Sequence, residues 1–231
     1  MRVILNVSSG NPRYLANQAR LIRQLSAIGE QADQLFWKDS MPSGSPSQQE
    51  TPYAFKAYAI LDAIKQGFDT LLWMDSSIVP VRKLAPLWEL VEQKGYWFSA
   101  NPGYGHAFVD PMSCGEVTCD SALAPLAITR EELFSVPHVI ATAFGLDLRF
   151  PIAQEFFRQF MVYAQDGRAF RGPYRNASKE ASSDPRVRGH LHDQTVASVI
   201  AYRLGMRLTR SPKWIVDGVS PTQDTFLEIH R

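Results

Sequence analysis

The sequence predicts an α/β fold in which helices cover both faces of a mostly parallel sheet, giving three layers. Short apolar segments alternate with segments of helical periodicity through residues 1–101. One strand-like segment, 70–74, has no polar alternation, which is typical of a strand buried on both faces. The chain has 231 residues, enough for one large domain with a well-buried core, and we expect a single domain over 1–231.

The elements of residues 1–101 alternate strictly between strand and helix. A glycine follows each expected helix, at Gly29, Gly67 and Gly95, and glycine commonly ends helices because it adopts left-handed backbone angles easily. This order predicts parallel strands joined by helical crossovers. The expected strands are 2–7, 34–37, 70–74 and 96–100, and the expected helices are 13–28, 52–66 and 84–94.

The second part of the chain is less regular. Glycine and proline interrupt residues 101–137 repeatedly, and a loop of this length in a compact domain is usually functional. The tail is expected to be irregular. The remaining expected elements are loops over 39–51 and 166–188, a strand over 138–144, helices over 151–164 and 196–204, and short strands over 206–208 and 214–216.

Composition narrows the classes of partner. Lys and Arg number 24 and Asp and Glu number 23, so the formal net charge is +1, and no strong field points to nucleic acid or a membrane surface. No apolar run approaches the roughly 20 residues that span a bilayer. Residues 2–7 read as a strand rather than a signal peptide. We therefore expect a cytoplasmic protein with no transmembrane segment and no nucleic-acid partner.

The first candidate for chemistry is Asp75, directly after the buried strand 70–74. A charge in the middle of such a strand would be costly to desolvate. At the carboxyl end, the side chain instead projects into the crevice where open α/β sheets bind ligands. Ser76 and Ser77 follow it. The alternative is that Asp75 only caps the following turn.

The second candidate is the segment Gly189–Gln194, which places His190, His192 and Asp193 at a loop-to-helix junction. Such a junction exposes backbone N–H groups and favours anions. Asp193 is also a suitable capping or first-turn residue, which is the structural alternative. Two histidines two positions apart do not face each other on a helix, so we expect one of them to be structural.

A third candidate is the turn after the first strand, where Ser8, Ser9 and Gly10 leave the backbone open to a phosphate or a base.

Three runs stand out when they are read together: FKAY (55–58), GFDTLLWMDSSI (67–78) and HDQTVAS (192–198). They resemble GT-A type nucleotide-sugar glycosyltransferases. In that family a helix carrying Lys or Arg precedes a strand that ends in an Asp-x-Asp motif, whose carboxylates hold a divalent metal at the donor diphosphate. The resemblance covers roughly residues 1–101 and 186–209. It implies a Rossmann-like GT-A sandwich with a nucleotide-binding half, 1–101, and an acceptor-binding and C-terminal half, 102–231.

The resemblance also implies the donor and its contacts. The donor would be a UDP- or GDP-sugar and the acceptor a saccharide or another hydroxyl compound. Mn²⁺ or Mg²⁺ would lie on Asp75, with His192 or His190 as a second ligand. The implied donor contacts are Ser8, Ser9, Gly10, Asp39, Lys56, Asp75, Ser76 and Ser77.

The sequence departs from the family pattern at Ser77, which stands where the second carboxylate is expected. Hard cations prefer several oxygen ligands, usually including carboxylates. Two possibilities stay open: a weakly held metal, or neutralisation of the diphosphate by basic residues such as Lys56 and the Arg171–Arg188 loop.

The implied reaction is displacement at a sugar anomeric carbon with a nucleoside diphosphate leaving, where a metal or cations stabilise the developing charge. An inverting enzyme needs a general base near the acceptor hydroxyl, and Asp193 is the first candidate and Asp147 the second. Retaining chemistry stays open, because these residues do not determine the anomeric outcome.

Two other functions are alternatives. A nucleotidyltransferase typically has a glycine-rich basic loop after its first strand, and Ser8–Arg13 is too short and too poor in glycine and lysine for that. A degenerate transferase that only binds a nucleotide-sugar or another protein is favoured by Ser77. The polar density of Gly189–Gln194 argues against it.

Overall fold

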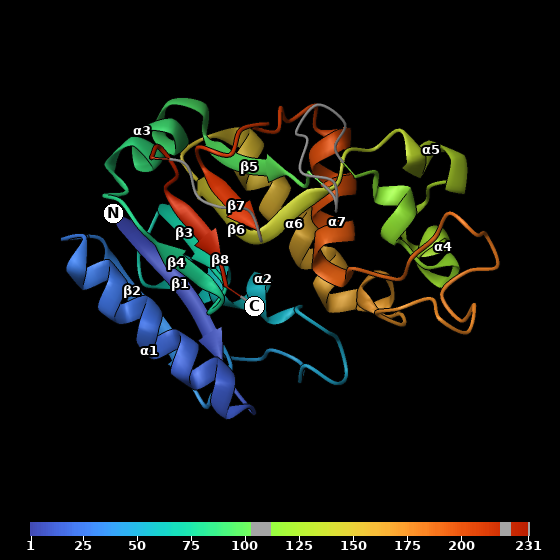
Figure 1. Cartoon of the computed structure of the whole chain (residues 1–231), viewed down its shortest axis with the longest axis horizontal. Coiled ribbons are helices and arrows are strands. Elements are labelled where there is room, and N and C mark those ends of the chain that lie inside the picture. The colour runs from blue at the N-terminus through green and yellow to red at the C-terminus, as the bar shows by residue number, and fades with distance from the viewer. Residues whose placement is uncertain (103–111, 218–222, 231) are drawn as a thin grey trace.

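A computed structural model describes residues 1–102, 112–217 and 223–230, and its centre is a five-stranded sheet of order β2-β1-β3-β6-β5 (Figure 1). β1 pairs in parallel with β2 and β3, whereas β6 is antiparallel to β3 and β5. Four of the five strands therefore run in one direction, and the prediction of a mostly parallel sheet is confirmed. The strands are β1 Arg2–Ser8, β2 Asp33–Lys38, β3 Thr70–Met74, β5 Tyr96–Ala100 and β6 Val139–Asp147.

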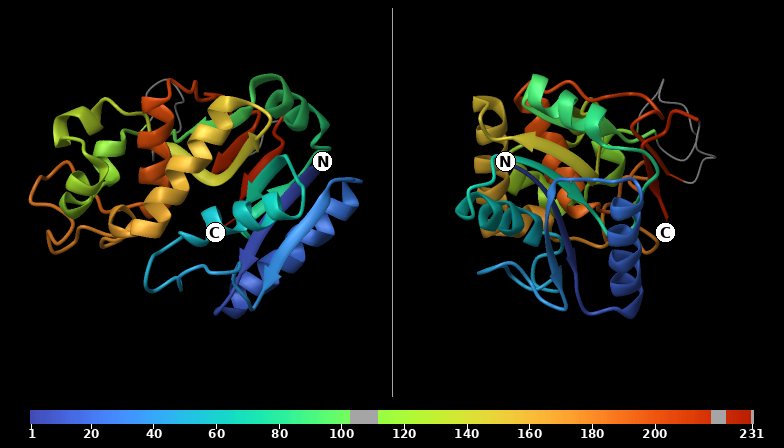
Figure 2. Two further views of the ribbon diagram at one scale, coloured as in Figure 1. Left: turned by 180° about the vertical axis from the view of Figure 1, so that it is seen from behind. Right: turned by 90° about the vertical axis from the view of Figure 1, so that its left-hand side faces the viewer.

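Helices lie on both faces of this sheet, as the right-hand view of Figure 2 shows. β3 supplies side chains to two cores, Leu71 and Trp73 to one and Leu72 and Met74 to the other. The strand is thus buried on both faces, as its apolar run predicts. The first core is covered by α2 Phe55–Lys65, α6 Pro151–Asp166 and α7 His192–Arg203, and the second by α1 Pro12–Ala27 and α3 Ala85–Lys94.

A small second sheet was not expected. It has the order β4-β8-β7, with β4 Ile78–Pro80, β7 Ile215–Asp217 and β8 Leu227–Ile229. Strands of three residues are too short to show a period, which is why β4 and β8 could not be predicted. β8 pairs with β4, and the His230 N–H donates to the Ser77 carbonyl at 2.8 Å. The distant segment 227–230 therefore lies beside the residues that follow Asp75.

Several boundaries differ from those expected. The strand over 206–208 is wrong, because these residues are irregular and only Thr209 forms an isolated bridge, to Ser99. α7 begins at His192 rather than at 196, and α2 begins at Phe55 rather than at 52. Part of the expected loop 101–137 lies outside the described residues. The rest of this loop contains four short helices, η2 Cys114–Val117, η3 Asp120–Ala122, α4 Leu123–Leu126 and α5 Arg130–Phe134. A further short helix, η4 Arg168–Phe170, follows α6.

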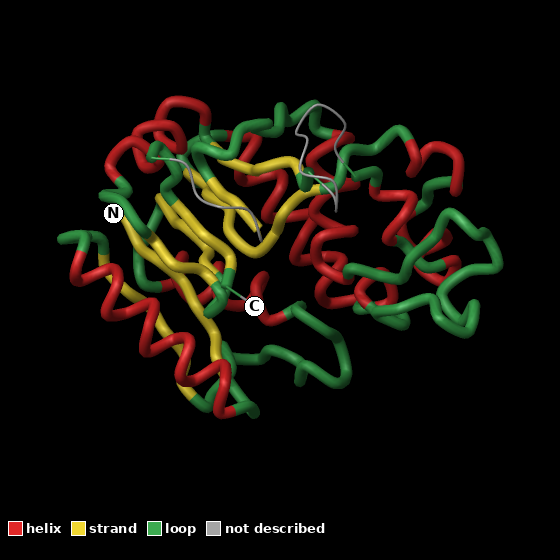
Figure 3. The backbone as a smooth tube through the Cα atoms, viewed as in Figure 1, coloured by secondary structure: helices red, strands yellow, loops and turns green. Residues whose placement is uncertain are grey.

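The loop over 171–191 and the helices α4 and α5 lie at the end of the molecule opposite α1 (Figure 3). None of the helices in the described ranges is long and apolar enough to cross a bilayer.

Candidate active site

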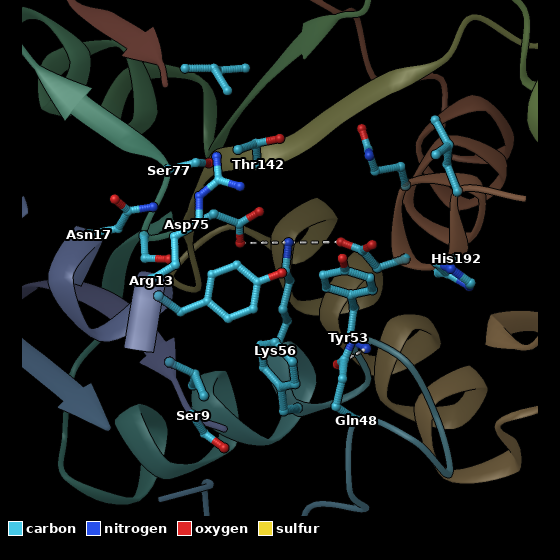
Figure 4. Close-up of a pocket in the computed structure, with 18 of the residues that line it drawn as sticks. Ser9, Arg13, Asn17, Gln48, Tyr53, Lys56, Asp75, Ser77, Thr142 and His192 are labelled. Carbon is cyan, nitrogen blue, oxygen red and sulfur yellow. Dashed lines mark hydrogen bonds and ion pairs between the residues drawn. The ribbon is translucent and has the colours of Figure 1, made fainter. Parts of the chain in front are cut away.

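A cavity of about 500 Å³ opens at the carboxyl end of β3. Asp75 and Ser77 line it from one side, and His192 lines it from the first turn of α7 (Figure 4). Their neighbours Ser76 and Asp193 also line the cavity. The two segments with the highest density of candidate residues in the sequence therefore face one space, although about half of the chain separates them.

Lys56, on α2, joins these two segments. Its Nζ lies 3.0 Å from Asp75 Oδ1 and 2.8 Å from Asp193 Oδ2, and it donates to the Ala141 carbonyl at 2.7 Å (Figure 4). The side chain is 1% exposed, so the three ammonium protons have three partners in a buried place. Burial lowers the pKa of Lys56, but the two carboxylates raise it by more, and the net shift is upward. The ammonium group therefore stays charged.

Asp75 reaches the cavity while one of its oxygens is held. Oδ1 accepts from Trp73 Nε1 at 2.7 Å as well as from Lys56, and the side chain is 26% exposed. Burial raises the pKa of the Asp75 carboxyl and Lys56 offsets only part of this. The partners of the carboxylate lie on β3 and α2 rather than in the turn that follows, so the capping alternative is wrong.

Asp193 is a first-turn residue of α7 but does not cap the helix. Leu191 is the N-cap residue, and no side chain supplies the capping hydrogen bond. The Asp193 carboxylate instead contacts Lys56 and is 4% exposed. Its position is thus determined by the buried ion pair rather than by capping.

The two candidate histidines have different environments. His190 is fully buried and does not line the cavity. Its Nδ1 accepts from the Cys119 N–H at 3.4 Å, and its Nε2 lies 3.1 Å from the Ala169 carbonyl. Both ring nitrogens are used by backbone groups, so His190 is the structural one of the pair.

His192 lines the cavity. Its Nδ1 lies 2.8 Å from the Phe170 carbonyl, and a carbonyl only accepts, so Nδ1 carries the proton and Nε2 remains for another partner. The ring stacks on Tyr53 with centroids 5.7 Å apart. Both residues have positive φ, 39° for His192 and 63° for Tyr53, and such backbone strain gathers at functional sites.

The buried histidines predict a loss of stability in acid. Burial lowers the pKa of His190 and of fully buried His138 to about 3. The unfolded chain binds these protons below its ordinary pKa near 6.5, so the free energy of unfolding falls as the pH falls below that value. Between pH 7 and pH 5 we expect a loss of about 2 kcal/mol per histidine, measured by urea unfolding. His138→Gln should remove about half of this pH dependence; an unchanged dependence would contradict the assignment.

Of the donor contacts expected after β1 and β2, some line the cavity and others do not. Ser9 lines the cavity. Ser8 is buried and its hydroxyl donates to Asn6 Oδ1 at 3.2 Å. Gly10 has φ of 75° and Asp39 has φ of 49°, and neither is among the described residues that line the cavity.

Asp147 lies apart from the site. It pairs with Thr70 at the beginning of β3, whereas Asp75 follows the end of that strand. Its carboxylate is fully buried against Arg149 at 2.6 Å. Because β6 is antiparallel, its carboxyl end lies at the opposite edge of the sheet.

Sequence reasoning missed several cavity residues, among them Arg13, Tyr53 and His230. Arg13 lies three positions after Gly10 of the candidate turn, so proximity in sequence could have indicated it. His230 reaches the site only through the unexpected β8, and no sequence signal indicated it.

The mostly parallel sheet with helices on both faces matches the fold of solved structures of GT-A type, so the predicted fold class is confirmed. One similar solved structure is a glycosyltransferase involved in the glycosylation of the major capsid of PBCV-1. It is 11% identical, with 99% of this chain and 92% of that chain covered and a TM-score of 0.56. Another is mouse xyloside xylosyltransferase 1 in its apo form, 12% identical, with 99% and 97% covered and a TM-score of 0.52. No protein-family model matches the chain, and no curated protein matches it.

Proposed function

We propose that this protein is a glycosyltransferase that moves a sugar from a UDP- or GDP-sugar to a saccharide or another hydroxyl acceptor. The observation that carries the proposal is the cavity in which Asp75 and Asp193 face each other across Lys56. Its place at the carboxyl end of β3 is where open α/β sheets bind ligands. The fold shared with two glycosyltransferases supports the same class of reaction.

In this proposal residues 1–101 hold the nucleotide and residues 102–231 the acceptor. Ser9, Asp75, Ser76 and Ser77 line the cavity and are the donor contacts that the proposal depends on. The other expected contacts, Ser8, Gly10 and Asp39, stay predictions.

The reaction breaks the bond between the anomeric carbon and the donor phosphate oxygen, and the electron pair leaves with the diphosphate. The acceptor oxygen forms the new bond and loses its proton. Asp193 is the candidate to take that proton in an inverting reaction, since it is the carboxylate on the α7 side of the cavity. Lys56 is a positioning residue that orients both carboxylates. The anomeric outcome stays open.

The expected Mn²⁺ or Mg²⁺ is not part of the proposal, because the donor set does not fit such an ion. Lys56 occupies Asp75 Oδ1, Ser77 supplies a hydroxyl in place of a carboxylate, and both nitrogens of His190 are engaged. His192 has one ring nitrogen, Nε2, that could bind a metal ion, because its Nδ1 is bound to the Phe170 carbonyl. In the parts of the chain that the structure describes, no three His, Cys, Asp or Glu side chains gather closely enough to hold a metal ion.

A thermal-shift and donor-hydrolysis screen with UDP-, GDP- and CMP-sugars tests the proposal. At least one UDP- or GDP-sugar should raise the melting temperature, and Asp75→Ala should weaken its binding about tenfold or more. Asp69→Ala is the matched control, because Asp69 lies at the opposite end of β3 and pairs with the N-terminal amine at the surface. The proposal fails if no nucleotide-sugar binds.

A non-catalytic nucleotide-sugar binding protein is the second candidate. It is favoured by Asp75, whose Oδ1 is already engaged by two partners, and by Ser77. Such a protein would be stabilised by the donor but would release no nucleoside diphosphate with any acceptor.

A further inference from the structure

A bound diphosphate needs positive charge, and the cavity offers little of it. Among the described residues that line it, the Lys and Arg side chains are Lys56 and Arg13. Lys56 already contacts three acceptors and is buried, so it could bind a phosphate only by leaving Asp75, Asp193 or the Ala141 carbonyl. The charge of Lys56 balances the two carboxylates rather than an added anion.

The loop Arg171–Arg188 does not supply the charge. Arg186 pairs with Asp184 and Glu131, both at 2.7 Å, and Arg188 pairs with Glu116 at 3.2 Å. Arg171 Nε donates to the Glu50 carbonyl at 2.8 Å. None of the arginines of this loop is among the described residues that line the cavity.

Arg13 differs from these residues in its exposure, in its place on the cavity wall and in its lack of an ion pair with the described residues. It lies on the first turn of α1, where its backbone N–H is held by the Asn11 side chain at 2.9 Å. The side chain is exposed, lines the cavity and extends toward Asp75 and Ser77 (Figure 4). It forms no ion pair with the residues that the structure describes. A guanidinium group presents paired N–H donors that match phosphate oxygens.

We propose that Arg13 binds the donor diphosphate in place of a divalent metal ion, so that donor binding does not require one. This inference rests on the proposed function. When the bond between the anomeric carbon and the phosphate oxygen breaks, the electron pair stays on that oxygen, and the Arg13 guanidinium stabilises the charge. The departure at Ser77 then has a reason: where the chain supplies the cation, a second carboxylate would oppose the anion.

Calorimetric titration of the full chain with UDP and with GDP tests the inference. The wild-type affinity should be the same within about threefold in excess EDTA and in excess Mn²⁺. Arg13→Ala should weaken binding about 10- to 100-fold, the loss expected for charge-assisted hydrogen bonds. Arg13→Lys should restore part of the affinity, because an ammonium group keeps the charge but loses the paired geometry.

Arg23→Ala is the matched control, because Arg23 is an exposed residue of the same helix that does not line the cavity. It should bind UDP like the wild type. Melting temperatures without nucleotide should be equal for the Arg13 and Arg23 variants, so that a folding defect is recognised. Binding that needs Mn²⁺, or that survives Arg13→Ala, overturns this inference alone. No binding of any nucleotide or nucleotide-sugar by the wild type overturns the proposed function together with it.

Discussion

Asp193→Asn is expected to slow sugar transfer by about 100- to 10,000-fold, the range for losing a general base. Asparagine keeps the shape of the side chain, and Lys56, which lies 2.8 Å from Asp193 Oδ2, keeps Asp75 as its counter-ion. Donor affinity and melting temperature should therefore change little. Nucleoside diphosphate release, followed with the donor and acceptor found by screening, measures the rate, and titration measures the affinity.

Asp147→Asn is the matched control for this experiment. Asp147 is equally buried and charge-paired but lies at the other end of the sheet, beside Thr70. Transfer per folded molecule should stay within about twofold of the wild type. Equal slowing in both variants would show that buried carboxylates act through stability, and an Asp193→Asn variant that only unfolds would remove the catalytic assignment.

Lys56→Met is expected to lower the free energy of unfolding by about 3–5 kcal/mol, because it leaves Asp75 and Asp193 facing each other without their shared counter-ion. For a chain of this size the melting temperature should fall by roughly 10 °C. Urea unfolding and calorimetry measure the two quantities. Lys65→Met on the same helix is the control, since Lys65 is 59% exposed and lies 3.6 Å from its partner Asp62.

A double-mutant cycle separates the charge effect from packing. If the cost of Lys56→Met comes from unpaired carboxylates, adding Asp193→Asn should recover a large part of it. A cost that stays the same in the Asp193→Asn background would mean that methionine simply packs poorly at this position.

Apart from β4, the strands and helices of the first half were predictable because each is long enough to show a helical period or an apolar run. The apolar run of β3, with Asp75 directly after it, predicted both the burial of the strand and the place of the carboxylate. The meeting of Asp75 with the His192–Asp193 segment followed from the family resemblance rather than from any local pattern.

Other features depend on contacts between segments that are distant in the sequence, and the sequence of one segment does not reveal such contacts. The direction of β6 is set by its pairing with β3 and β5, and it decides that Asp147 lies away from the cavity. Lys56 was expected to face the donor. Its burial depends on two carboxylates and a carbonyl from three other segments, and the periodicity of α2 alone does not predict these contacts.

The arrangement of Lys56, Asp75 and Asp193 has a consequence for anyone who wishes to redesign the cavity. Removing Lys56 alone leaves two carboxylates without their shared counter-ion in a poorly hydrated place, so this cation tolerates replacement only together with the carboxylates. Exchanging all three at once for apolar residues of similar volume can keep the scaffold intact while erasing its reactivity.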